Sequence, residues 1–227
     1  MLREATGRCA FGSEGFYDAD GAAMRLAGAR LVDVDDVDPV QNGAAATFER
    51  VVSAARRPRT VARLPVFVGG DPSLSFPLLR AYDDVPEVHV VRLDARLGFH
   101  DTRRGSRLSG ASTFRRSAED VPGLQRNTAI GMRSASAGRE AVEAARARGH
   151  TLVTARRLRN DPAAVLEALP ERAALYPSLY VDVFDPSIVP GTGDPEVDGL
   201  GYAEVLRVVE GGREVVRASY ADRMTHR

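Results

Sequence analysis

The fold of this chain is decided by the stretch Ser178-Leu-Tyr-Val-Asp-Val-Phe-Asp-Pro-Ser-Ile-Val-Pro-Gly-Thr-Gly-Asp-Pro-Glu-Val-Asp-Gly-Leu200. The alternating apolar residues Leu179, Val181 and Val183 predict the body of a buried β-strand. The prolines and glycines that follow cannot continue a helix or a strand ladder, so they predict a long, turn-rich loop, which carries four carboxylates. A structured acidic loop at a strand end is typical of a functional site.

The composition sets limits on the class of protein. The chain of 227 residues is 44% hydrophobic and 27% charged, and we expect one domain over residues 1–227. Basic and acidic residues balance at 31 each, which gives no field for nucleic acid or a membrane surface, and no apolar run is long enough to span a bilayer. The N-terminus lacks an apolar signal core, so we expect a cytoplasmic protein.

Outward from this stretch, predicted helices and strands alternate along the chain. Helices are predicted at residues 19–29, 44–57, 74–82, 137–148 and 202–210, and one more begins at Asn160 or Asp161. Strands are predicted at residues 31–35, 64–68, 88–94, 128–132, 151–154 and 214–219. This alternation favours an α/β protein whose parallel sheet is covered on both faces. The acidic run at residues 33–38 is better explained as a solvated turn than as a calcium loop.

Three predicted strand ends carry distinctive loops, and ligands of open α/β sheets bind at such ends. The loops are Gly69-Gly-Asp-Pro-Ser73, Leu93-Asp-Ala-Arg-Leu-Gly-Phe-His-Asp101 and Tyr180-Val-Asp-Val-Phe-Asp185. In this order and spacing they resemble the ureohydrolase family of arginase and agmatinase. The likeness runs from about Val32 to Val216 and includes Thr47-Phe-Glu-Arg50, Phe114-Arg-Arg116 and Ile130-Gly-Met-Arg133.

The resemblance implies a three-layer α/β/α sandwich with a mostly parallel sheet. It also implies two bridged manganese ions that activate a hydroxide, which attacks a guanidinium carbon and releases urea. Of the six metal-ligand positions in the family, this chain keeps only Asp94 and Asp182. The other four positions hold residues that cannot bind the ions in the same way: Pro72, Arg96, Gly98 and Tyr180.

Other positions of the family site are also changed. The family histidine that assists proton transfer corresponds to Gly110, so we expect no competent catalytic residue. Glu196 corresponds to the residue that holds the substrate guanidinium, and the alternative for Glu196 is a loop carboxylate kept for turn hydrogen bonds.

Two hypotheses concern what replaces the lost ligands. His100 and Asp101, together with Asp94 and Asp182, could form a mononuclear site, although a loop histidine more often makes local hydrogen bonds. Arg96 could bridge Asp94 and Asp182 as an internal substitute for the charge of the metal.

The sequence therefore supports a ureohydrolase-family protein without manganese bound in stoichiometric amount, acting as a non-catalytic binding or regulatory subunit. We expect a homo-oligomer, or a hetero-oligomer with an active paralogue, and a guanidino compound as a candidate ligand. The alternative is an active amidinohydrolase of an agmatine-, arginine- or guanidinobutyrate-like substrate, with Mn2+ in a reduced site. A third hypothesis is a protein that keeps the family fold but binds no ligand. We expect the chain to be short for the family at both ends. Either the sheet has lost an element at each end, or a partner covers its edges, or the start codon is misplaced.

Overall fold

The computed structural model describes residues 12–133, 135, 137–163, 165, 169 and 174–211. The chain divides into two compact units, Met1–Asp36 and Val37–Arg227. The single domain expected over residues 1–227 stays a prediction. The predicted strand at residues 214–219 lies outside the described residues.

The described part of the first unit is a short hairpin. Strand β1 (Phe16–Asp18) pairs with strand β2 (Ala23–Arg25) in antiparallel fashion. The helix predicted at residues 19–29 is wrong, because Ala22 adopts a φ of 45° and the Asp18 carboxylate accepts a hydrogen bond from the Gly21 N–H at 3.1 Å. These two features make a tight turn between the strands. Residues 31–35, predicted as a strand, are not assigned to one, and Asp33 instead accepts a hydrogen bond from the Asp35 N–H at 2.9 Å.

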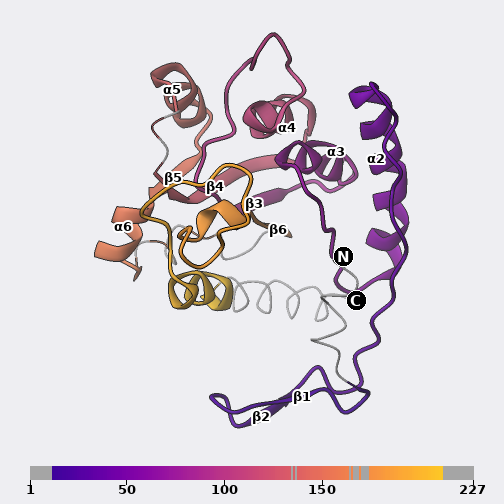
Figure 1. Cartoon of the computed structure of the whole chain (residues 1–227). Helices are drawn as coiled ribbons and strands as arrows, with labels where there is room; N and C mark the ends of the chain where they lie inside the picture. The colour runs from indigo at the N-terminus through magenta and orange to yellow at the C-terminus, as the bar shows by residue number, and fades with distance from the viewer. Residues whose placement is uncertain are drawn as a thin grey trace. The chain divides into compact units, whose positions relative to one another are not determined.

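The second unit is built on a sheet of four parallel strands in the order β5-β4-β3-β6 (Figure 1). The strands are β3 (Val88–Leu93), β4 (Leu124–Met132), β5 (Thr151–Thr154) and β6 (Ala174–Leu179). Strand β3 is buried along its whole length, because it is central and both of its faces are covered. Its carboxyl end therefore lies beside those of β4 and β6.

Helices cover both faces of the sheet. One face packs against α3 (Ser75–Arg80), α4 (Thr113–Asp120) and α5 (Arg139–Ala147), through a core that includes Val90 and Phe114. The opposite face packs against α6 (Ala155–Asn160) and the helical residues 202–211, through a core that includes Val91 and Ile130. The three-layer α/β/α sandwich and its parallel sheet are thus confirmed (Figure 1).

Helix α2 (Ala44–Val61) was predicted from its apolar face, and that face is buried. Its residues Val52 and Ala55 contact Ala81 in a separate small core, which Phe67 also joins. The strand predicted at residues 64–68 is wrong, because this segment does not join the sheet. The side chains that were expected to be buried there are largely exposed: Leu64 by 73%, Val66 by 74% and Val68 by 72%.

The strand predicted across residues 178–183 also needs correction. Strand β6 ends at Leu179, and Val181–Val183 forms a 3-10 turn, labelled η4. Because β6 is the last strand of the described sheet, Leu179 and Val181 are about half exposed, and only Val183 is fully buried. Helix α6 was not predicted, and the Thr154 side chain caps it by accepting a hydrogen bond from the Arg157 N–H at 3.1 Å. The helix predicted from Asn160 or Asp161 follows α6: residues 163 and 165 are helical, and most of the remaining residues of that segment lie outside the described ones.

Membrane insertion was not expected, and none of the helices in the described ranges has both the length and the apolar character of a bilayer span.

Two buried histidines should make the free energy of unfolding depend on pH. His89 shares a hydrogen bond of 3.0 Å with Thr128, and His150 accepts one of 3.2 Å from the Asn127 N–H. Burial lowers the pKa of both imidazoles to about 4. The unfolded chain therefore binds more protons than the folded chain between about pH 6.5 and 4. The contribution of the neutral histidines to the free energy of unfolding is complete above about pH 6.5 and is lost as the pH falls towards 4.

We expect urea denaturation to show a lower free energy of unfolding at about pH 5 than at about pH 7. The double variant His89→Gln/His150→Asn should show a smaller drop, because neither replacement titrates. Comparing the two proteins isolates the histidines from carboxylates that titrate in the same range. An equal drop in both proteins would show that the histidines do not cause it.

Candidate functional site

The carboxyl end of strand β3 holds the first of two arginine–carboxylate pairs. Arg92 is fully buried, and its guanidinium lies 2.6 Å from the carboxylate of Asp94. The same guanidinium donates to the Asn127 side chain at 3.2 Å and to the carbonyl oxygens of Arg96 and Leu97. Its hydrogen-bonding capacity is therefore largely used inside the protein.

Strand geometry explains the position of Arg92. Successive side chains of a strand point to opposite faces, so Arg92 shares the face of Val90 and lies under helix α4. Its guanidinium carbon is 4.1 Å from the centre of the Phe114 ring, a cation–π contact. Burial raises the pKa of Asp94 to about 6, while the positive charge of Arg92 acts in the opposite direction.

The second pair joins the end of β3 to the loop after β6. The Arg96 guanidinium contacts the buried carboxylate of Asp182 through Nη1, and its Nη2 lies 3.0 Å from the Asp194 carboxylate and 3.5 Å from Glu196. Nη2 also donates to the Asp194 carbonyl oxygen at 2.6 Å. One guanidinium therefore meets three carboxylates.

The hypothesis that Arg96 bridges Asp94 and Asp182 is correct for Asp182 and needs correction for Asp94. The Arg96 side chain pairs with Asp182, whereas Asp94 receives only the Arg96 backbone N–H, at 2.7 Å. The cation that pairs with Asp94 is Arg92. Each of the two retained carboxylates thus has its own arginine.

Two further arginines hold the acidic loop in place. Arg133, which follows β4, donates to a group of backbone carbonyl oxygens from both ends of the loop: those of Asp182, Val183, Phe184, Glu196 and Val197. Arg159 in α6 pairs with the Asp198 carboxylate at 2.6 Å and donates to the Gly199 carbonyl at 2.6 Å. The loop conformation therefore does not depend on Arg96 alone.

The loop also stabilises itself through Asp185. Its carboxylate accepts hydrogen bonds from the Ser187 N–H at 3.0 Å and from the Gly199 N–H at 3.0 Å. The Ser187 hydroxyl, which donates at 2.7 Å, and these N–H groups lower the pKa of Asp185, and the bond to Gly199 ties the beginning of the loop to its end. The turn-rich loop predicted after the strand is confirmed as an ordered element.

The positions that the resemblance marks as changed lie close to one another. Pro72 begins the 3-10 turn Pro72–Leu74, and a Cβ atom placed on Gly110 would lie 3.2 Å from the Pro72 ring. Gly98 has a φ of 59°, and a Cβ atom there would lie 3.0 Å from the Phe114 ring. Larger side chains at Gly98 and Gly110 would therefore need neighbouring groups to move.

Tyr180 closes the same region from the side of β6. Its hydroxyl group is 2.6 Å from the Ser75 hydroxyl, and its ring packs edge-on against Phe114 with 6.3 Å between ring centres. Burial raises the pKa of Tyr180, so the phenol is neutral at about pH 7 and does not supply the negative charge that a carboxylate would.

The residues present do not fit a binuclear manganese site. Within the described ranges, no three His, Cys, Asp or Glu side chains are grouped so that they could hold a metal ion. The two carboxylates at retained ligand positions instead face guanidinium groups, whose positive charge opposes a divalent ion. The assignment of Asp94 and Asp182 as metal ligands stays a prediction from the resemblance.

The mononuclear site expected from His100 and Asp101 also stays a prediction. The Asp101 carboxylate lies 2.7 Å from Arg116 and 3.2 Å from Arg107, in a cluster of arginines near the start of α4. His100 is partly buried, and its backbone N–H donates to the Ala111 carbonyl at 2.9 Å. In the part of the chain that the structure describes, these two residues are not grouped with the retained carboxylates in the way that metal ligands would be.

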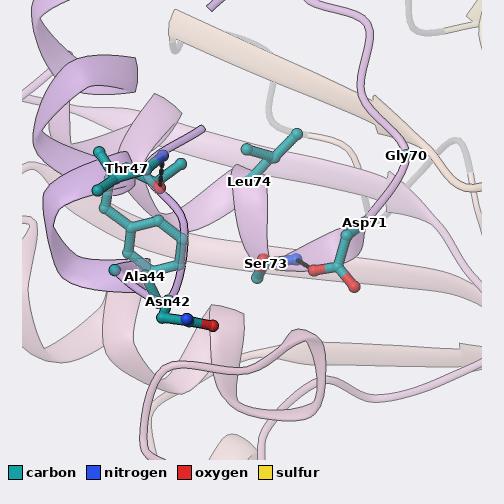
Figure 2. Close-up of a pocket in the computed structure, with 10 residues that line it drawn as sticks. Asn42, Ala44, Thr47, Gly70, Asp71, Ser73 and Leu74 are labelled. Atoms are coloured by element: carbon teal, nitrogen blue, oxygen red, sulfur yellow. Dashed lines mark hydrogen bonds between the residues drawn. The ribbon is translucent and has the colours of Figure 1, made fainter. Parts of the chain in front are cut away.

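A separate pocket of about 590 Å³ opens at the N-terminus of α2 (Figure 2). Figure 2 shows Thr47 and Asn42 on one side and the segment from Gly70 to Leu74 on the other. Thr47 accepts a hydrogen bond from the Val40 N–H at 2.9 Å, and Asp71 accepts one from the Ser73 N–H at 2.8 Å. These two side chains are therefore already engaged in local structure.

Comparison with known proteins identifies the family of this chain. The sequence model of the arginase family matches residues 1–224. The chain belongs to the arginase family. It is 36% identical over 197 residues to the agmatinase of Pyrococcus horikoshii, covering 86% of this chain and 64% of that protein. It is 30% identical over 154 residues to the guanidinobutyrase of Pseudomonas aeruginosa, covering 65% of this chain and 48% of that protein.

The fold agrees with this membership. The agmatine ureohydrolase of Thermoplasma volcanium superposes with a TM-score of 0.74 at 24% identity, over 91% of this chain and 68% of that one. The chain spans less than two thirds of the length of the two curated arginase-family relatives named above.

Sequence reasoning missed the two arginines that do most to organise the site. Arg92 falls within the strand predicted at residues 88–94 and was given no role, although a charged residue inside a fully buried strand needs a partner. That rule would have pointed to Asp94, two residues away on the same face. Arg133 was noted only as part of a family motif, and its role depends on loop carbonyls that the sequence does not place.

Proposed function

We propose that this arginase-family protein does not carry out manganese-dependent amidinohydrolysis and acts as a non-catalytic binding or regulatory subunit. The observation that carries the proposal is the pairing of Arg92 with Asp94 and of Arg96 with Asp182. These two carboxylates are the family ligands that the chain retains, and both are already neutralised by cations from the same segment.

Electrostatics support this proposal. A divalent ion at either carboxylate would be repelled by a guanidinium a few ångströms away, and breaking a buried pair leaves an uncompensated charge. Arg92 cannot turn away to solvent, because it is fully buried and bonded to Asn127 and two carbonyl oxygens. Metal binding at Asp94 would thus require the buried Arg92 side chain and its partners to rearrange.

A subunit role is supported by exposed apolar surface. Leu64, Val66 and Val68 are all largely exposed and lie in one extended segment, and Val197 in the acidic loop is 80% exposed. Large apolar side chains exposed in this way are typical of association sites. We propose a homo-oligomer, or a hetero-oligomer with a catalytically active paralogue, in the cytoplasm, with a guanidino compound as candidate small ligand.

A second candidate function is hydrolysis of a guanidino compound. The observation that favours it is the set of relatives: proteins 36% and 30% identical to this chain are named agmatinase and guanidinobutyrase. Under this alternative, Asp94 and Asp182 would bind Mn2+ in a reduced site, after Arg92 and Arg96 had moved away. The names of the relatives support this candidate better than they support loss of activity, and the paired arginines of this chain oppose it.

Urea release separates the two candidates. After incubation with manganese chloride, we expect the protein to release no more urea from agmatine, 4-guanidinobutyrate or arginine than a blank without protein. The reason is that neither retained carboxylate is available to bind an ion that activates water. Turnover that disappears in the Asp94→Asn and Asp182→Asn variants would establish the hydrolase and contradict our proposal.

A further inference from the structure

The loop between strand β3 and helix α4 gathers positive charge, although the chain as a whole is balanced at 31 basic and 31 acidic residues. Residues 102–107 of this loop are all exposed, and Figure 1 shows the loop extending past α4. At its tip, Arg103 and Arg104 form no ion pair with any residue that the structure describes. Two guanidinium groups are therefore left for a partner to meet.

The tip of the loop is a hydrogen-bonded turn. The Arg103 and Ser106 backbones exchange two hydrogen bonds, of 2.9 Å and 3.0 Å. The two residues between them, Arg104 and Gly105, both have a positive φ, of 50° and 80°. These are the features of a type I′ hairpin turn, in which asparagine, aspartate or glycine usually precedes the glycine. Turn chemistry therefore does not explain the arginine, and a contact made by its side chain would.

Ion pairs fix the base of the loop. They join three arginines to two carboxylates: Arg107, Arg115 and Arg116 to Asp101 and Glu119. The shortest of these contacts, 2.7 Å, is between Asp101 and Arg116, which is buried. Two outer members of the network, Glu140 and Arg148, cancel in charge. Together with the two arginines of the tip, the region has three positive charges in excess.

We propose that the loop tip, defined by Arg103 and Arg104, docks against a cluster of carboxylates on the surface of a different protein chain. This inference rests on the proposed function, because it names the kind of partner that the binding or regulatory subunit meets. Guanidinium groups suit such a partner, since their planar N–H donors match the two oxygen atoms of a carboxylate. The hydrogen-bonded turn holds both groups in place before the partner arrives, which lowers the cost of ordering them.

The loop favours a protein partner over a nucleic acid or a membrane. A duplex or an anionic bilayer is usually held by about four or more basic side chains at once, whereas this loop leaves two unpaired. The side chains of Asp101 and Glu119 are 44% and 24% exposed, and their carboxylates would repel a continuous row of phosphates. A compact acidic patch on a folded protein meets the tip without meeting these carboxylates.

The same charge argues against a second copy of this chain at this face. In a twofold interface the same patch occurs on both subunits, so two loop tips would bring like charges together. A twofold homo-oligomer would thus use another surface. The loop tip stays available to the partner of a hetero-oligomer.

Binding of an acidic peptide tests the proposal. Fluorescein-labelled octaglutamate is the probe, and its fluorescence anisotropy is followed as protein is added in about 50 mM sodium chloride. The wild-type protein should bind the probe, and binding should weaken at about 300 mM salt, because exposed charges are screened. Arg103→Glu/Arg104→Glu should raise Kd by about tenfold or more, since two attractive charges become repulsive.

Two further variants sharpen the test. Arg156→Glu/Arg157→Glu makes the same change of charge at two neighbouring exposed arginines of α6, and its Kd should change by less than about threefold. Arg103→Gln/Arg104→Asn removes the two charges without reversing them, and asparagine tolerates a positive φ, so it replaces the first variant if that one disturbs the turn. Its Kd should lie between those of the wild-type protein and of Arg103→Glu/Arg104→Glu.

Sedimentation velocity checks the choice of partner. Arg103→Glu/Arg104→Glu should have the oligomeric state of the wild-type protein, because the loop tip takes no part in contacts between copies. A changed oligomeric state would place the loop in a homo-oligomer and overturn the proposal.

The peptide experiment has distinct outcomes. Loss of binding confined to the loop variants supports the proposal. An equal loss in the α6 variant, no binding by the wild-type protein, or tighter binding of octathymidylate or of phosphatidylserine vesicles would overturn it. Urea release is a separate readout, so failure of peptide binding without urea release contradicts this inference alone and leaves the non-catalytic function standing.

Discussion

Replacing Arg92 with methionine is expected to lower the free energy of unfolding by about 3–5 kcal/mol, which is the usual cost of leaving one partner of a buried ion pair alone. Methionine fills much of the volume beneath Phe114 but leaves the buried carboxylate of Asp94 without its cation at 2.6 Å. It also removes the donor to Asn127. Urea denaturation followed by circular dichroism measures the change.

The double variant Arg92→Met/Asp94→Asn tests the physical cause. Because it removes both charges, we expect it to be more stable than Arg92→Met alone, and far more stable than the sum of the two single effects would suggest. Arg207→Ala is the matched control, since Arg207 is exposed and its loss should change stability by less than about 0.5 kcal/mol. Additive single effects would show that Arg92 does not stabilise Asp94.

Replacing Arg133 with alanine is expected to loosen the whole acidic loop and to lower the free energy of unfolding by about 2–4 kcal/mol. Arg133 is the shared donor to carbonyl oxygens at both ends of the loop, which include Asp182 at 2.6 Å and Glu196 at 2.8 Å. Without it these partly buried oxygens lose their donor. Hydrogen–deuterium exchange should increase at residues 182–200 more than in strand β3.

Arg133→Lys gives a second, more specific readout. A lysine keeps the charge but has no planar fork, so we expect it to recover only part of the protection from exchange. Arg146→Ala, an exposed arginine of α5, is the control and should leave the exchange of the loop unchanged. Full protection in Arg133→Lys would mean that charge alone holds the loop.

Much of the fold could be predicted because local pattern and burial agree. In α2, the periodic residues Phe48, Val51, Val52 and Ala55 predicted the buried face that the structure has. The apolar run from Val88 predicted β3, which is buried along its length. The motif loops and the family match then pointed to the same parallel sheet.

The failures occur where tertiary position overrides local pattern. Leu179 and Val181 alternate as a buried strand should, but β6 lies at the edge of the described sheet and ends at Leu179. Residues 64–68 have the same apolar alternation and do not join the sheet. Alternation predicts which side chains share a face, but it does not say whether a neighbouring strand will pair.

The candidate site could be predicted in outline and not in detail. The changed positions Pro72, Gly98 and Tyr180 were visible in the sequence because a motif gave them an expected identity. Which arginine pairs with which carboxylate was not visible. The side chain of Arg96 reaches across to a residue 86 positions later, and only the fold brings Asp182 to it.

Manganese stoichiometry tests the central claim most directly. Purified protein is dialysed to equilibrium against manganese chloride, and the metal per chain is measured by inductively coupled plasma mass spectrometry beside the Asp94→Asn/Asp182→Asn variant. We predict far less than one ion per chain, with no difference between the two proteins, because Arg92 and Arg96 already neutralise both carboxylates. Two ions per chain in the wild-type protein, lost in the variant, would contradict the account.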